Sequence, residues 1–195
     1  VLLWATLASL ATLLSDIPPF LLTGIGLLIG AAVSLPALRH GFTPWKIPVR
    51  TLLLGVYGLF GYHFMLFLAL QTAPAVEANL VNYLWPLLIV LLSPLFTKSL
   101  KLNVRYVLAA LSGFAGAVIA ITYNSSAIAS SSIEVGYLFA LAAAVIWATY
   151  SLATTKVPSF PTPAIGLFAL VSGVLALGAH FLFEPAATIS SSDWA

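Results

Sequence analysis

The sequence is marked first by what it lacks, which is cysteine and charge. Its 195 residues include no Cys, one Met and only 6% Asp, Glu, Lys and Arg, whereas soluble domains carry about 25% charged residues. Without cysteine this stretch can form no disulfide, no thiolate nucleophile and no Cys-based metal site. A net charge of +2 without any run of Lys or Arg gives no basis for binding nucleic acid.

In place of charge, the chain has long apolar segments. Hydrophobic residues make up 62% of it, a share that suits lipid rather than water as solvent. Uncharged stretches of 20 to 28 residues separate successive blocks of charge, and about 20 helical residues cross a hydrocarbon core of about 30 Å. The pattern predicts seven transmembrane helices, the first of them cut short, at residues 1–14, 18–37, 51–71, 77–97, 104–123, 135–155 and 163–183.

The signs of the charges predict how these helices are oriented. The blocks alternate in sign, so that all seven Lys and Arg fall on one side of the membrane and all five Asp and Glu fall on the other. By the positive-inside rule the Lys/Arg loops are cytoplasmic. We therefore expect a multi-pass protein of the plasma membrane, the inner membrane of a bacterium, embedded in the lipid bilayer.

A short motif recurs along the chain and indicates an internal repeat. The tripeptide WAT at 4–6 returns at 147–149, and the same offset of 143 carries Pro18 onto Pro161. Five predicted crossings separate the copies, and an odd number places the second copy upside down. Inverted repeats around a shared midplane site are typical of secondary transporters.

The repeat also predicts the domain organisation. Residues 1–123 form the first unit, 124–134 a Ser-rich linker on the outer side, and 135–195 the start of the second unit. Because the chain opens without Met inside an apolar helix and the second unit has only two helices, we expect a longer protein. About three more helices should follow Ala195.

Two segments resemble a known transporter family. The run "GYHFMLFLALQTAPAVEANLVNYLWPLLIVLLSPLF" resembles the third and fourth helices of the EamA branch of the drug/metabolite transporter superfamily. The run "GYLFALAAAVIWATYSLATTK" resembles the opening helix of its second unit. The resemblance implies an all-α integral membrane bundle of ten helices in two inverted five-helix repeats, seven of them in this chain. The aromatic content of the central helices is most similar to the YddG-type exporters of aromatic amino acids.

One segment departs from the family pattern. After the fourth helix, "TKSLKLN" stands where the commonest subgroup has an acidic-basic pair. This weakens the match to that subgroup and leaves the expected fold intact.

Position along the crossings indicates which polar side chains lie deep. His63 is 13 residues after Arg50 and 14 before Glu77, which places it near the bilayer centre, with the hydroxyl of Tyr62 at similar depth on another face. Intramembrane ionisable groups usually mark pathways, so His63 is a candidate to line a polar cavity. The alternative is a hydrogen bond to a neighbouring helix that only holds the bundle together.

The fourth crossing carries a polar stripe. Asn79, Asn82 and Pro86 follow i, i+3, i+7 spacing, with Tyr83 on the same broad face, and amides facing lipid would be costly. Pro86 has no N–H for the carbonyl of Asn82, so we expect a break that exposes backbone to a solute. The alternative is a kink that serves packing alone. Trp85, about 12 Å deep, lines the cavity or faces lipid.

The sixth crossing carries an aromatic pair. Trp147, about 14 Å deep, and Tyr150 share a face at i, i+3 spacing. Packing is the usual role of such a pair, but recurrence of the motif at Trp4 favours cavity lining.

Other features are interpreted as structural. We expect His180, Trp4, Trp45 and Trp194 at the membrane interfaces. Small residues that let helices approach closely occur at Gly26-x-x-x-Gly30, Gly55-x-x-Gly58-x-x-Gly61 and Ser112-x-x-x-Gly116.

Together these features predict a transporter and no enzyme. No Asp, Glu, Lys or Arg lies deep within a predicted crossing. The crossings therefore lack the side chains that a catalytic carboxylate pair, a Ser-His-Asp triad or a metal cluster would need. We expect alternating-access export of a small metabolite, an aromatic or other neutral amino acid, without cofactor, by a monomer or weak homodimer. The alternatives are a carrier of another solute on this fold, such as a drug or nucleotide sugar, and a membrane scaffold without transport.

Overall fold

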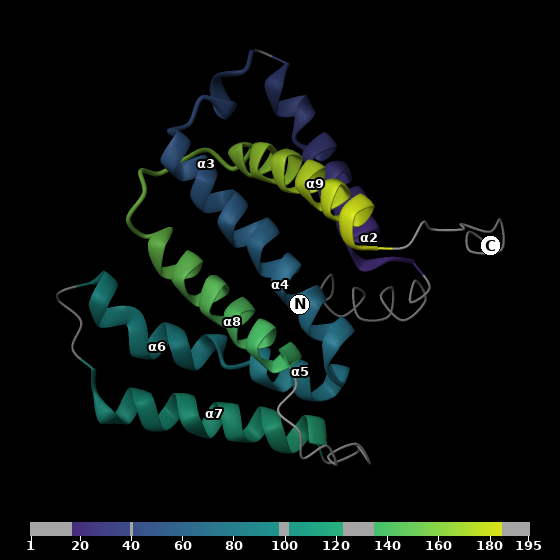
Figure 1. Ribbon diagram of the computed structural model, residues 1–195. Helices are drawn as coiled ribbons and strands as arrows, with labels where there is room; N and C mark the ends of the chain where they lie inside the picture. The colour runs from purple at the N-terminus through teal and green to yellow at the C-terminus, as the bar shows by residue number, and fades with distance from the viewer. Residues whose placement is uncertain (1–16, 40, 98–101, 123–134, 185–195) are drawn as a thin grey trace.

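The chain folds into helices alone wherever its structure is described. The computed structural model describes residues 17–39, 41–97, 102–122 and 135–184, and these contain no β-strand (Figure 1). The α-helices are α2 (Pro19–Val33), α3 (Val49–Val56), α4 (Tyr62–Thr72), α5 (Ala75–Asn82), α6 (Trp85–Phe96), α7 (Val104–Thr122), α8 (Val135–Ala153) and α9 (Ala164–Phe183). A π-helical turn, η3 (Tyr57–Gly61), joins α3 to α4, and the 3₁₀ turns η1 (Leu35–Leu38) and η2 (Thr43–Trp45) follow α2.

The observed helices confirm the predicted all-α membrane fold. Four helical runs, Val49–Thr72, Ala75–Phe96, Val135–Ala153 and Ala164–Phe183, are long and apolar enough to span a bilayer. The helix α2 and the first part of α7 are shorter apolar helices. Each of the predicted crossings after the first therefore contains helix, and the first crossing, with Trp4, lies outside the described residues, as does Trp194.

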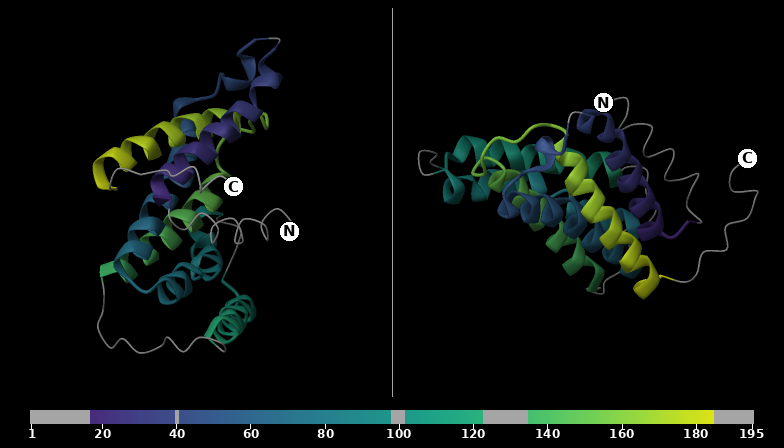
Figure 2. Two further views of the ribbon diagram at one scale, coloured as in Figure 1. Left: turned by 90° about the vertical axis from the view of Figure 1, so that its right-hand side faces the viewer. Right: turned by 90° about the horizontal axis from the view of Figure 1, so that it is seen from above.

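The helix α8 lies at the centre of the described bundle. It packs against α4 on one side and against α5 and α6 on the other, with α7 beyond α6 (Figures 1 and 2). Its buried positions are almost all small, namely Gly136, Ala140, Ala143, Ala144 and Ala148. Small residues allow close approach of helices, and so they let α8 touch several neighbours at once.

The helices α2 and α9 form an antiparallel pair beside this centre (Figure 2). A Cβ atom added to Gly24 of α2 would lie 2.7 Å from the Leu177 side chain of α9. A Cβ atom added to Gly173 of α9 would lie 3.1 Å from the carbonyl oxygen of Gly24. The two backbones therefore come close in the middle of the pair, and a larger residue at either glycine would require its neighbours to shift.

The predicted close approaches are confirmed at some glycines, and at others the described residues do not show them. Cβ atoms added to Gly55 and Gly58 would overlap the rings of Phe168 and Tyr150. Gly26 and Gly30, in contrast, have no described neighbouring atom within 4 Å of an added Cβ, because α2 turns its Gly24 face to α9. In the described structure the added Cβ of Gly116, in the Ser112-x-x-x-Gly116 pattern, is equally open.

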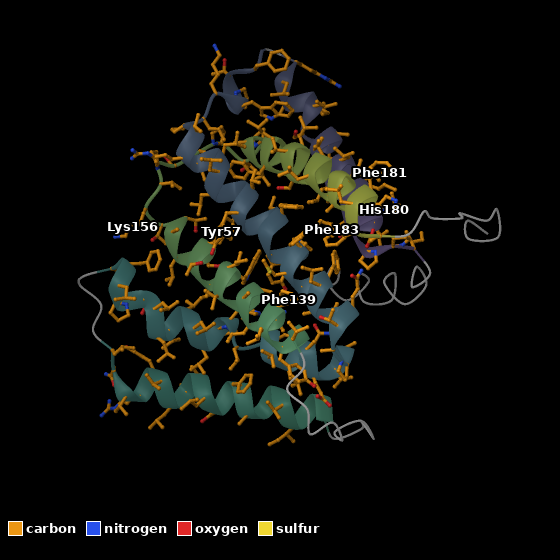
Figure 3. All side chains as sticks on the ribbon, viewed as in Figure 1. Tyr57, Phe139, Lys156, His180, Phe181 and Phe183 are labelled. Carbon is orange, nitrogen blue, oxygen red and sulfur yellow. The ribbon has the colours of Figure 1, made fainter. Side chains whose placement is uncertain are left out.

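His180 lies in the last turn of α9, where the described residues bury it, and its place at the membrane interface stays a prediction. It is 6% exposed, and its Nδ1 lies 2.8 Å from Oε2 of Glu184, one turn further along. The Glu184 carboxylate also accepts hydrogen bonds from the backbone N–H groups of Phe20, at 2.8 Å, and Leu21, at 3.3 Å. The start of α2 packs over the end of α9, and this packing buries both side chains. Figure 3 shows His180 and Lys156 at opposite ends of the bundle.

Candidate functional site

The polar centre of the bundle begins at an interruption between α5 and α6. The helix α5 ends at Asn82, a turn follows at Tyr83 and Leu84, and α6 begins at Trp85 with Pro86 in its first turn. Proline suits the first turn of a helix because its missing N–H has no intrahelical partner there. The break predicted at Pro86 is confirmed, and it makes Asn82 the last residue of α5.

Asn82 forms a polar link to α4. It is 5% exposed, and its Nδ2 donates to the hydroxyl oxygen of Tyr62 at 3.1 Å. Its side-chain oxygen Oδ1 is buried without a hydrogen-bond partner among the described residues. An unsatisfied buried acceptor is costly and calls for an explanation, such as a bound molecule that donates to it.

Aromatic rings extend this link to α8. The ring centroids of Tyr62 and Trp147 are 5.0 Å apart, and those of Trp147 and Tyr150 are 5.5 Å apart. Such separations are typical of favourable aromatic pairs. The Tyr150 ring rests on the backbone at Gly58, inside the π-helical turn. We call Tyr62, His63, Asn82, Trp147 and Tyr150 the Tyr62 cluster.

His63 is held by its own helix. Its Nδ1 lies 2.6 Å from the carbonyl oxygen of Leu59, within the π-helical turn. A carbonyl oxygen only accepts, so the proton of this hydrogen bond belongs to Nδ1, and Nε2 of the neutral ring is an acceptor. The imidazole also contacts the rings of Tyr62, at 5.2 Å, and Phe67, at 6.0 Å. The predicted alternative, a hydrogen bond to a neighbouring helix, is not what the described residues show.

Four predicted residues lie near the interruption but outside the cluster. Among the described residues no hydrogen bond or ring contact joins Asn79, Tyr83, Trp85 or Pro86 to it. Tyr83 is 45% exposed and Pro86 is also exposed, whereas Asn82 is buried. The turn at residues 83–84 interrupts the helical register between Asn82 and Pro86, and cavity lining by these four residues stays a prediction.

Sequence reasoning missed the π-helical turn that carries the cluster. Such turns are rare and frequently occur at functional sites. A second link lies at the same place: the Tyr57 hydroxyl donates to Oγ1 of Thr149 at 2.9 Å, since Thr149 gives its own proton to the carbonyl of Val145. The sequence gives no specific signal for this turn.

The cluster is electrically neutral and chemically mixed. It contains no Asp, Glu, Lys or Arg, and the described residues include no group of three or more His, Cys, Asp or Glu that could hold a metal ion. Its rings offer apolar faces for stacking and cation–π contact. Its acceptors, Oδ1 of Asn82 and Nε2 of His63, suit N–H donors of a small amphipathic solute.

Comparison with known proteins identifies relatives of the whole chain. The sequence pattern of the EamA-like transporter family matches residues 1–122. The aromatic amino acid exporter YddG of Ancylobacter novellus is 41% identical over 202 residues, covering 100% of this chain and 69% of that protein. A protein of the same name from Salmonella typhimurium is 33% identical, over 82% of this chain and 55% of its own length. One solved structure superposes with a TM-score of 0.86 at 40% identity, over 99% of this chain and 67% of the other.

Proposed function

The chain belongs to the EamA-like transporter family, and from that premise we propose that it exports aromatic amino acids across the bacterial inner membrane. Two curated relatives carry that activity in their names. The proposal places the solute at the Tyr62 cluster, with the Lys/Arg loops on the cytoplasmic side. The observation that carries it is the continuous link from Asn82 through Tyr62 to Trp147, three side chains from three helices.

The polar groups of the cluster suit the backbone of a zwitterionic amino acid. The Tyr62 oxygen accepts from Asn82, so its own proton is free to donate to a carboxylate. Oδ1 of Asn82 and Nε2 of His63 are free to accept from an ammonium group. Neither end of the solute then requires a charged partner in the membrane, where such a partner is expensive.

The aromatic groups suit the side chain of the same solute. Trp147 lies between Tyr62 and Tyr150 and supplies a large, rigid face. Aromatic pairs contribute about 0.5–1.5 kcal/mol beyond area burial, enough to favour Trp, Tyr and Phe over Leu by several-fold. The candidates Asn79, Tyr83, Trp85 and Pro86 border the interruption, and we propose that they contact the solute at another stage of the cycle.

Alternating access completes the proposal. Broken helices near the midplane are typical sites of solute binding in transporters built from inverted repeats, and the α5–α6 interruption is such a break. The antiparallel packing of α2 against α9 supports an inverted relationship between residues 1–123 and 135–195. We expect one unit to rock against the other and to expose the cluster to each side in turn.

The test is solute flux with the full-length protein in proteoliposomes. A panel of labelled Trp, Phe, Tyr, Leu, Lys and Glu is offered, and counterflow is measured for each. We expect Trp, Phe and Tyr to be carried at least several-fold faster than Leu, and Trp147→Ala to lower their flux. Tyr106→Ala is the matched control, because Tyr106 lies 65% exposed on α7, outside the cluster. Equal flux of all six solutes, or none, would refute the assignment.

A further inference from the structure

The paired helices α2 and α9 are fastened at the end that carries His180. The Glu184 carboxylate, with only 1% of its side chain exposed, accepts from the backbone N–H groups of Phe20 and Leu21 in the first turn of α2. His180 holds the same carboxylate at 2.8 Å. We call this set of contacts the Glu184 clasp. It joins a residue directly after α9 to the start of α2.

The opposite end of the pair is fastened by a related contact. The indole Nε1 of Trp45, in the segment after α2, donates to the carbonyl oxygen of Pro163, the residue before α9, at 2.9 Å. We call this the Trp45 clasp. The repeat offset of 143 carries Phe20 onto Pro163. The two clasps therefore bond equivalent positions, at the start of α2 in the first unit and just before α9 in the second.

Between the clasps the two backbones come close. The approach of Gly173 to Gly24 lies between the Glu184 clasp and the contact of Ser34 with Gly166 near the other end. Leu177 of α9 packs on Gly24 and Leu28 of α2 packs on Gly173, so the two helices touch most closely at this point, and we place the pivot of a tilt here. A tilt that opens one end must close the other.

We propose that the two clasps are alternate latches of the transport cycle, one released when the bundle opens to the outside and the other when it opens to the cytoplasm. This rests on the alternating access of the proposed function, with Glu184 on the outer side. The geometry assigns a conformational role to His180 and Glu184, which the solute site does not use.

The latches are chemically unequal. The Glu184 clasp uses an ionised acceptor at a helix N-terminus, with two backbone donors and an imidazole. Charge-assisted hydrogen bonds are roughly twice as strong as neutral ones, and the helix dipole favours an anion at this position. The Trp45 clasp is a single neutral hydrogen bond. The outer latch is therefore the stronger, and it biases the resting protein toward closure on the outside.

Spin-label distances in the full-length protein test the proposal. The described part of the chain contains no cysteine to compete for labelling. The outer pair is L22C with F181C and the inner pair V33C with I165C; Leu22 is partly exposed in the first turns of α2, and the other three positions are exposed. In E184Q we expect the main outer distance to shift to a longer value while the inner distance does not lengthen. In W45F, which keeps an aromatic ring, we expect the reverse.

Two controls separate a latch from a simple structural bond. E77Q removes another carboxylate, whose partner Tyr137 lies on α8, and it should leave both distances unchanged. If E184Q lengthens both distances, α2 detaches as a whole and the latch is refuted. Unchanged outer distances in E184Q, or an unchanged inner distance in W45F, also refute it. The spin-label distances are measured without any transport assay. A solute panel without aromatic preference would therefore overturn the proposed function and leave the result on the latches standing.

Discussion

The Asn82 side chain donates to the Tyr62 hydroxyl at 3.1 Å, and this bond joins the last residue of α5 to the first residue of α4. Both ends of the bond adjoin an irregularity in a helix. Tyr62 follows the π-helical turn at Tyr57–Gly61, and Asn82 precedes the turn at residues 83–84. The two places where backbone pairing departs from the α-helix thus meet within the bundle, next to Trp147.

Tyr62→Phe tests this bond directly. The variant keeps the ring contact with Trp147 but removes the acceptor of the Asn82 Nδ2 donor, beside an Oδ1 that already has no partner among the described residues. An unsatisfied buried group costs about 1–3 kcal/mol, so we expect a lower thermal unfolding temperature in detergent and weaker solute binding.

The matched comparison is a double-mutant cycle. Asn82→Leu removes the amide at similar volume, and the double variant removes both partners. We expect a coupling energy of about 0.5–1.5 kcal/mol, in the range measured for hydrogen bonds between membrane helices. Strictly additive effects of the two substitutions would show that the bond contributes nothing to stability.

His63 offers a comparison between its two ring nitrogens. In His63→Asn, the amide NH₂ group can replace Nδ1 as the donor to the Leu59 carbonyl. In His63→Gln, the longer side chain places its amide oxygen, an acceptor, near the position of Nε2. If Nε2 receives the ammonium group, His63→Gln should retain more flux than His63→Asn, by roughly tenfold for one charge-assisted hydrogen bond. Counterflow with equal amounts of folded protein measures the ratio. Equal flux in the two variants would remove Nε2 from the site.

Much of the fold could be predicted because lipid imposes simple rules. Backbone groups in a bilayer must be satisfied within helices, so the spacing of charges alone located the crossings. The run predicted at 135–155 is observed at Val135–Ala153, and the run predicted at 163–183 is observed at Ala164–Phe183. The break before Pro86 was also predictable, because proline has no N–H for the carbonyl of Asn82, although Pro94 is accommodated inside α6.

The contacts of the site could be predicted only in part, since they depend on how helices rotate against each other. Depth identified His63 and Trp147, and spacing identified Tyr150, but neither reveals that Tyr62 contacts both Asn82 and Trp147. The burial of His180 could not be predicted for the same reason: its i, i+4 neighbour Glu184 is visible in the sequence, but the start of α2 that buries both is not.

Gly58→Ala is expected to disturb the cluster through its packing. The added methyl group would overlap the Tyr150 ring, which packs at a tilt against Trp147. Overpacking of this kind costs about 1–3 kcal/mol, and a displaced Tyr150 should also weaken solute binding.

Gly61→Ala is the matched control for Gly58→Ala. It lies in the same π-helical turn, but its added Cβ would stay 3.8 Å from Ile146, an ordinary contact. Both substitutions reduce the backbone freedom of the unfolded chain by the same amount. The difference between the two unfolding temperatures therefore measures the cost of the overlap between the added methyl group and the Tyr150 ring. Indistinguishable unfolding temperatures would mean that Tyr150 moves aside at no cost.

Flux of the aromatic amino acid is expected to persist without a pH gradient. The Tyr62 cluster contains no carboxylate, and steep proton coupling usually uses a titratable carboxylate inside the membrane. The buried carboxylate of the described residues, Glu184, lies after the end of α9 and is bonded to His180 and α2 rather than to the cluster. The test is uptake of labelled Trp into proteoliposomes, measured with equal pH on both sides and again with a pH gradient. Protein-free liposomes correct for leakage. Equal initial rates are the expected result, whereas a rate that vanishes at equal pH would mean that a coupled proton accompanies the solute and that its binding group lies elsewhere in the protein.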